Sequence, residues 1–168
     1  MDRNTLREPV EIKDKMEHSP GSPDEPIPII LCGKALEIGE IVSRSTQPEF
    51  QVIHFINTFE DAKANLGSLV AGHGPQTPSS NHIGSHDYSK PPRAVVFGRA
   101  YNSAHVKELH RLFRGKANHP VAWIVSDPSV KPPGRPGPSY AEEAANNVRR
   151  AFARWSDAGG ADKDLVYY

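Results

Sequence analysis

The sequence predicts a single small α/β domain in three layers, with a mainly parallel sheet of four or five strands and helices on both faces. Two observations predict this class. Short apolar runs alternate along the chain with longer segments whose apolar positions recur at helical spacing. The apolar runs are also nearly continuous rather than alternating, which is typical of parallel strands buried on both sides.

The first 25 residues differ from the rest, because they mix charged residues with Ser, Pro and Gly and offer almost no periodic apolar face. We therefore expect residues 1–25 to form a disordered tail. Residues 26–168 are expected to form the domain, since a chain of 168 residues has room for one ordinary core.

The first strand–helix unit lies between residues 27 and 48. Residues 29–31 predict a buried strand, Gly33 a tight turn, and residues 40–45 a short helix that Pro48 ends. Residues 50–56 are rich in β-branched and aromatic side chains, so they are expected to form the second strand.

The second helix is expected to begin at Thr58, because a hydroxyl followed by two acidic residues is typical of an N-cap. Residues 71–93 are rich in Gly, Pro, Ser and His and predict a long loop, either functional or disordered. Residues 94–98 form the third predicted strand.

The third helix is expected to be capped by Asn102 or Ser103 and to bury Val106, Leu109 and Phe113. Residues 121–125 predict the fourth strand, and residues 128–138 a second loop rich in Pro and Gly. The last helix carries an apolar stripe formed by Ala141, Ala144, Ala145, Val148, Phe152 and Trp155. Residues 165–168 form either a fifth, edge strand or an ordered tail.

This architecture is Rossmann-like or flavodoxin-like, and such open sheets bind ligands beyond the carboxyl ends of their strands. That rule selects Lys34, Arg99 and Asn102 as candidate substrate-binding residues, since they follow predicted strands. Lys34 and Arg99 are suited to hold an anionic group. The competing interpretation is a solvated turn lysine and a surface arginine.

Four residues are candidates for a chemical step. Asp127 is suited to act as a base and Tyr101 as a hydrogen-bond donor, and His86 can serve as acid or base if the long loop folds over the strand ends. Cys32 ends the first strand just before a helix, where a thiol can become a nucleophile. The alternatives are local roles: Asp127 precedes a proline in a turn, and a free cysteine is commonly buried.

Residues 31–39, with the sequence LCGKALEIG, resemble the first turn of extended short-chain dehydrogenases and related NAD(P)-binding proteins, whose pattern is G-x-x-G-x-x-G. Gly33 and Gly39 match the outer glycines, and Leu36 stands in place of the middle one. The resemblance implies an NAD(P) site in which Gly33 and Gly39 approach the pyrophosphate. In the other interpretation, these glycines serve only the turn and close helix packing.

Composition excludes several classes of function. Lys and Arg together number 20, as do Asp and Glu, so no basic footprint for nucleic acid is expected, nor a segment aimed at a membrane. The single cysteine excludes an internal disulfide. His82, His86 and Asp87 carry metal-ligand chemistry but lie in a loop, and we expect no metal site. The charged start of the chain differs from a signal peptide, so a cytoplasmic protein is expected.

With its Pro-rich tail, long loops and strand-end residues, the whole chain resembles small α/β proteins that accompany specialised-metabolite pathways in filamentous fungi. This resemblance implies an accessory small-molecule-binding protein, or a cofactor-independent enzyme of the isomerase, cyclase or lyase type, acting on an acidic metabolite. Two alternatives stay open: a degenerate Rossmann domain that binds NAD(P) as a sensor or reductase, and a non-catalytic interaction module. The partner is expected to be an anionic small molecule, and a homodimer is also open.

Overall fold

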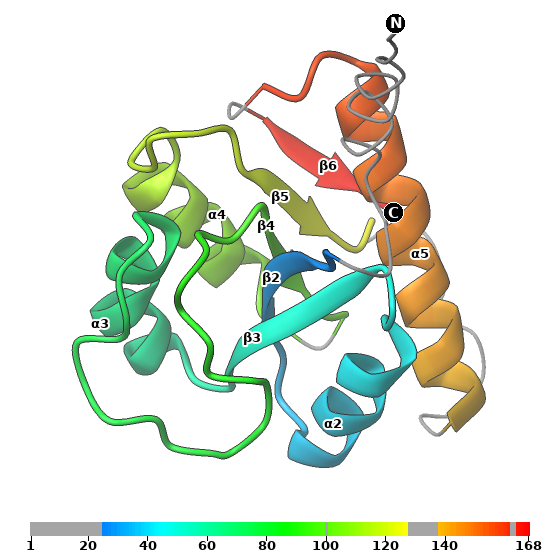
Figure 1. The fold of residues 1–168 in the computed structure, drawn as a ribbon, viewed down its shortest axis with the longest axis horizontal. Coiled ribbons are helices and arrows are strands. Elements are labelled where there is room, and N and C mark those ends of the chain that lie inside the picture. Colours follow the sequence, from blue (N-terminus) through cyan, green and yellow to red (C-terminus); the bar gives the residue numbers. More distant parts are fainter. Residues whose placement is uncertain (1–24, 100, 128–137, 162–163) are drawn as a thin grey trace, which may run out of the picture.

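The computed structural model describes residues 25–99, 101–127, 138–161 and 164–168, and these form a five-stranded, all-parallel sheet (Figure 1). The strands are β2 (Ile27–Cys32), β3 (Phe50–Ile56), β4 (Ala94–Phe97), β5 (Ala122–Val125) and β6 (Leu165–Tyr167). Their spatial order is β3-β2-β4-β5-β6, which is the flavodoxin-like order. The predicted α/β class is confirmed, and the last residues do contribute a fifth, edge strand.

Helices cover both faces of the sheet, as predicted. One face carries α2 (Leu36–Ser45) and α5 (Pro138–Asp157), and the other carries α3 (Phe59–Val70) and α4 (Ser103–Phe113) (Figure 1). Strand β2 supplies both cores, because Ile29 and Leu31 face the first pair of helices while Ile30 and Cys32 face the second. Burial on both sides explains why the strands read as continuous apolar runs.

Helix α2 begins at Leu36, so the predicted start at residue 40 was wrong. The N-cap residue, Ala35, makes no side-chain hydrogen bond to the helix. The usual capping signal is therefore missing from the sequence, and only packing against the sheet shows where the helix begins. By contrast, Thr58 Oγ1 accepts from Asp61 N (3.1 Å) and Asn102 Oδ1 accepts from Ala104 N (2.8 Å), which confirms two predicted caps.

Residues 71–93 run along the outer edge of β3. Three hydrogen bonds to β3 carbonyls hold the segment there: Ser85 N to Val52 (2.9 Å), His86 N to Ile53 (2.9 Å) and Asn81 Nδ2 to Phe55 (3.0 Å). The start of the segment is held by Asn65, whose Oδ1 accepts from Gln76 N (2.6 Å) and Thr77 N (2.9 Å). The loop thus satisfies backbone groups that an edge strand otherwise leaves open to other chains.

Two predicted segments lie outside the described residues: the tail, except for Glu25, and the loop over residues 128–137.

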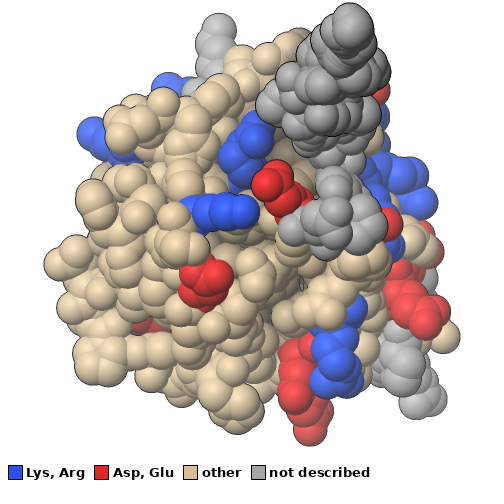
Figure 2. All heavy atoms as spheres, viewed as in Figure 1, with Lys and Arg blue, Asp and Glu red and all other residues tan. Residues whose placement is uncertain are grey.

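No described helix is long and apolar enough to cross a bilayer. Figure 2 shows acidic and basic side chains interspersed over the visible face, without a continuous patch of either sign.

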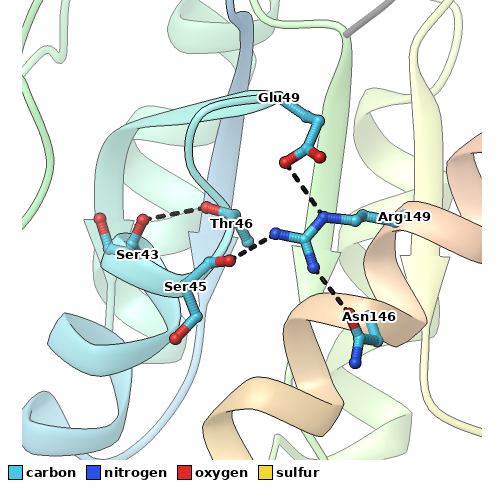
Figure 3. A network of polar contacts seen from close by, with 6 residues as sticks. All are labelled: Ser43, Ser45, Thr46, Glu49, Asn146 and Arg149. Atoms are coloured by element: carbon cyan, nitrogen blue, oxygen red, sulfur yellow. Dashed lines mark hydrogen bonds and ion pairs between the residues drawn. The ribbon is translucent and has the colours of Figure 1, made fainter. Parts of the chain in front are cut away.

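Arg149 clamps α5 to the connection between α2 and β3 (Figure 3). Its guanidinium donates to Glu49 Oε1 (3.1 Å), to Asn146 Oδ1 (2.8 Å) and to the Ser45 carbonyl oxygen (2.5 Å). The clamp joins the two helices at the C-terminal end of α2. Toward the N-terminal end of α2, the space between the same helices holds the pocket described next.

Candidate functional site

The order of the strands reverses between β2 and β4, because the chain goes from β2 to β3 on one side and then to β4 on the other. In open parallel sheets, ligands bind in the crevice beyond the carboxyl ends of the strands at such a switch point. The turn after β2 brings Gly33 and Lys34 to this place, and the turn after β4 brings Gly98 and Arg99. A pocket of about 190 Å³ lies there.

The pocket lies on the face of the sheet that carries α2 and α5. Most of its wall is apolar, with Ile38 and Val42 on α2, Ala144 and Val148 on α5, and the ring of Phe55 on β3. Its polar lining residues are Lys34, Arg99, Tyr140, Glu143, Asn147 and Tyr168. An apolar chamber with a few polar groups is the usual form of a small-molecule site.

Gly33 and Gly39 are both placed against the ring of Phe55. A Cβ atom on Gly39 would lie 2.5 Å from Phe55 Cε1, and one on Gly33 would lie 3.4 Å from the same atom. Because Phe55 is 1% exposed, the missing side chain of Gly39 is what lets the ring pack against α2. This geometry supports the packing interpretation of the glycine pattern.

Arg99 and Tyr168 form one side of the pocket. The guanidinium carbon of Arg99 lies 5.5 Å from the centre of the Tyr168 ring, within the range of a cation–π contact. The Tyr168 hydroxyl donates to the Phe97 carbonyl oxygen at 3.3 Å. Burial raises the pKa of Tyr168 to about 12, although the charge of Arg99 opposes the shift. The phenol is therefore neutral at physiological pH, and Arg99 is the cation on this wall.

Lys34 is an exposed residue that also lines the pocket. Its ammonium nitrogen lies 5.8 Å from the centre of the Tyr101 ring, on the other side of the β2 turn. The structure thus brings Lys34 and Arg99, two of the three predicted substrate-binding residues, to one pocket. The third, Asn102, is not among its lining residues, and its side-chain oxygen caps α4.

Cys32 and Tyr101 direct their side chains into the core on the opposite face of the sheet. Burial of the fully enclosed Cys32 raises the pKa of its thiol well above the ordinary range, which leaves it protonated and a weak nucleophile. Burial likewise raises the pKa of Tyr101, whose hydroxyl donates to the Thr58 carbonyl oxygen at 3.3 Å. The predicted chemical roles of both residues stay predictions that this placement does not favour.

His86 was expected over the carboxyl ends of the strands, whereas the structure holds it beside the middle of β3. Its ring lies 5.6 Å from that of His54, whose Nδ1 lies 2.8 Å from the Tyr88 hydroxyl oxygen. The hydrogen bonds to the β3 edge decide this position.

Asp127 donates its backbone N–H to the Tyr168 carbonyl oxygen (3.0 Å) and is also absent from the pocket lining.

Sequence reasoning missed Tyr140, Glu143, Asn147 and Tyr168. The first three recur at helical spacing, so they lie along one side of α5, beside the apolar stripe that was recognised. That spacing is the signal that could have found them. Among the described residues, no group of three or more His, Cys, Asp or Glu side chains is placed to hold a metal ion.

No family model matches the chain, and no solved structure matches it. A curated protein of Aspergillus oryzae, "Kojic acid related protein 6", is 30% identical to it over 149 residues. The match covers 88% of this chain and 89% of that protein, so it extends over nearly the full length of both.

Proposed function

The chain belongs to the family of the Aspergillus oryzae kojic acid related protein 6, and on this premise we propose that it is an accessory protein of specialised metabolism whose switch-point pocket binds an acidic small molecule. The relative is named for a relation to kojic acid. The family supports the metabolic setting, and the pocket supports the kind of molecule that is bound.

The observation that carries the proposal is a largely apolar pocket whose lining residues include Lys34 and Arg99. A carboxylate placed at these cations would gain charge-assisted hydrogen bonds, each contributing about 1.5–3 kcal/mol. The body of the ligand would be buried between Val42 of α2 and Val148 of α5, at about 25 cal/mol per Å² of apolar surface.

A cofactor-independent reaction would additionally need a group that moves a proton. Glu143 is the carboxylate in the lining, and it also faces Arg150 at 3.5 Å. Tyr140 and Tyr168 supply phenol hydroxyls in the same pocket. Proton transfer at an acidic metabolite, as in an isomerisation or elimination, therefore has its candidate groups on α5 and at Tyr168, which follows β6. Binding alone requires only the two cations.

The test is ligand binding by the purified full-length chain, measured by isothermal titration with benzoate, 4-hydroxybenzoate, kojic acid, NAD and NADP. We expect benzoate-like acids to bind. Arg99→Ala should lower their affinity by about 10- to 150-fold, which is the equivalent of one charge-assisted contact. Lys34→Ala should lower the affinity as well.

Lys63→Ala is the matched control, because this α3 lysine lies against Phe59 and not in the pocket. It should leave the affinity unchanged. Binding of NAD or NADP in place of the acids would support the Rossmann alternative, and an Arg99→Ala variant that binds acids as tightly as the wild type would refute the proposed site.

A further inference from the structure

The size of the pocket sets a narrow limit on its ligand. A dry cavity of about 150 Å³ holds one benzene molecule, whereas pockets for drug-sized ligands span about 300–1,000 Å³. The volume of about 190 Å³ between α2 and α5 therefore suits one ring with one or two small substituents. A fused two-ring system is larger than this size class.

The ring of Phe55 forms part of the pocket wall and packs closely against the β2 turn and α2. Gly33 and Gly39 lie against its Cε1 and Cζ atoms, and the residue is 1% exposed. Its backbone is held from both sides, since β2 pairs with it in the sheet and Asn81 Nδ2 donates to its carbonyl oxygen at 3.0 Å. In a closely packed protein core, added volume causes strain, because the neighbouring side chains cannot rearrange freely.

The charged lining residues follow the strands, with Lys34 after β2 and Arg99 after β4. Arg99 carries a planar guanidinium that can pair with both oxygens of a carboxylate, and its ring contact with Tyr168 lies at the same pocket. A ligand whose acid group pairs with Arg99 would place its ring among the apolar lining residues, of which Phe55 is one. The size of that ring system then decides which acids fit.

We propose that the ligand is a planar acid with a single ring, and that Phe55 is the residue that excludes acids with two fused rings. The proposal rests on the proposed function, namely that this pocket binds an acid. It adds a substrate class and a specificity-determining residue.

The test compares the affinities of benzoate and 2-naphthoate for the wild type, Phe55→Leu and Phe50→Leu. We expect the wild type to prefer benzoate by about tenfold or more, in the range that one additional group costs in an apolar pocket. Phe55→Leu removes the far end of the ring and should reduce this preference by about tenfold, mainly through tighter naphthoate binding.

Phe50→Leu is the matched control. Phe50 lies on the same strand, belongs to the same core and is 3% exposed, but it packs on Phe152 (ring centres 5.3 Å apart) and does not line the pocket. It should lose comparable stability and keep the wild-type preference. If Phe55→Leu fails to fold, Phe55→Met takes its place, because the flexible methionine conserves more of the volume.

The outcomes separate the two proposals. If the wild type binds neither acid, the proposed function fails and the size limit fails with it. If the wild type binds benzoate and naphthoate equally well, or if the Phe55 variant keeps the wild-type preference, the pocket still binds acids but Phe55 does not select them. Reduced preference in Phe50→Leu as well would assign the effect to general loosening of the core and overturn the role of Phe55.

Discussion

Gly39→Ala is expected to destabilise the protein, whereas Gly67→Ala, a similar change in another helix, is expected to be nearly neutral. Both glycines lie inside helices against the end of a phenylalanine ring. A Cβ on Gly39 would lie 2.5 Å from Phe55 Cε1, and one on Gly67 would lie 2.8 Å from Phe113 Cε1. The local clash is thus alike, and the difference lies in whether the ring can move.

The magnitude follows from two opposing contributions. Replacing a helical glycine by alanine stabilises the helix by about 0.8–1 kcal/mol. Overpacking a closed core costs about 1–3 kcal/mol. Phe55 is enclosed by the sheet and by α2, so the overpacking cost applies, and the two contributions leave a net loss of up to about 2 kcal/mol. Phe113 is the last residue of α4 and only partly buried, so its ring can turn outward and the two contributions nearly cancel.

The assay is thermal and urea unfolding of both variants beside the wild type. For a chain of this size, about 1 kcal/mol lowers Tm by about 2–4 °C, so Gly39→Ala should unfold up to about 8 °C below the wild type. In the double variant Gly39→Ala with Phe55→Leu, the shortened side chain gives room to the new methyl group, so the combined loss should be smaller than the sum. Additive losses in the double variant, or equal losses for the two glycines, would show that a confined Phe55 ring is not the cause.

Two further predictions concern stability. Burial and the nearby His86 lower the pKa of His54, while Asp61 opposes the shift, so the native state binds this proton less readily than the unfolded chain. The free energy of unfolding should therefore fall as pH drops below about 6.5, by up to about 1.4 kcal/mol per pH unit. The fall should be shallower in His54→Asn. Parallel pH profiles of the wild type and this variant, measured by urea titration, would contradict the role of His54. Arg149→Ala should lower the free energy of unfolding by about 1–2 kcal/mol, because it removes the contacts to Glu49 and Ser45. Arg150→Ala removes an ion pair between side chains that are 58% and 47% exposed, so it should change the urea midpoint little. Equal losses in the two variants would show that the Arg149 contacts add no stability beyond that of a surface pair.

Local chemistry explains which features were predictable from the sequence. The strands were predictable because burial on both faces requires continuous apolar runs, and the caps at Thr58 and Asn102 because each involves a side chain and a backbone group within three residues. The start of α2 was mispredicted for the same reason, since Ala35 supplies no such bond. Convergence of Lys34 and Arg99 on one pocket followed from the strand-end rule.

Apolar periodicity and strand ends were thus enough to predict the class of fold and the edge of the sheet that carries the pocket. The lining of that pocket depends on contacts between distant parts of the chain: Arg149 meets Glu49 across 100 residues, Phe55 occupies the space that Gly39 leaves, and residues of α5 together with Tyr168 complete the pocket. These contacts depend on which elements pack side by side. Hydrophobic burial is non-directional, so the periodicity that predicts a buried face carries no record of its partner.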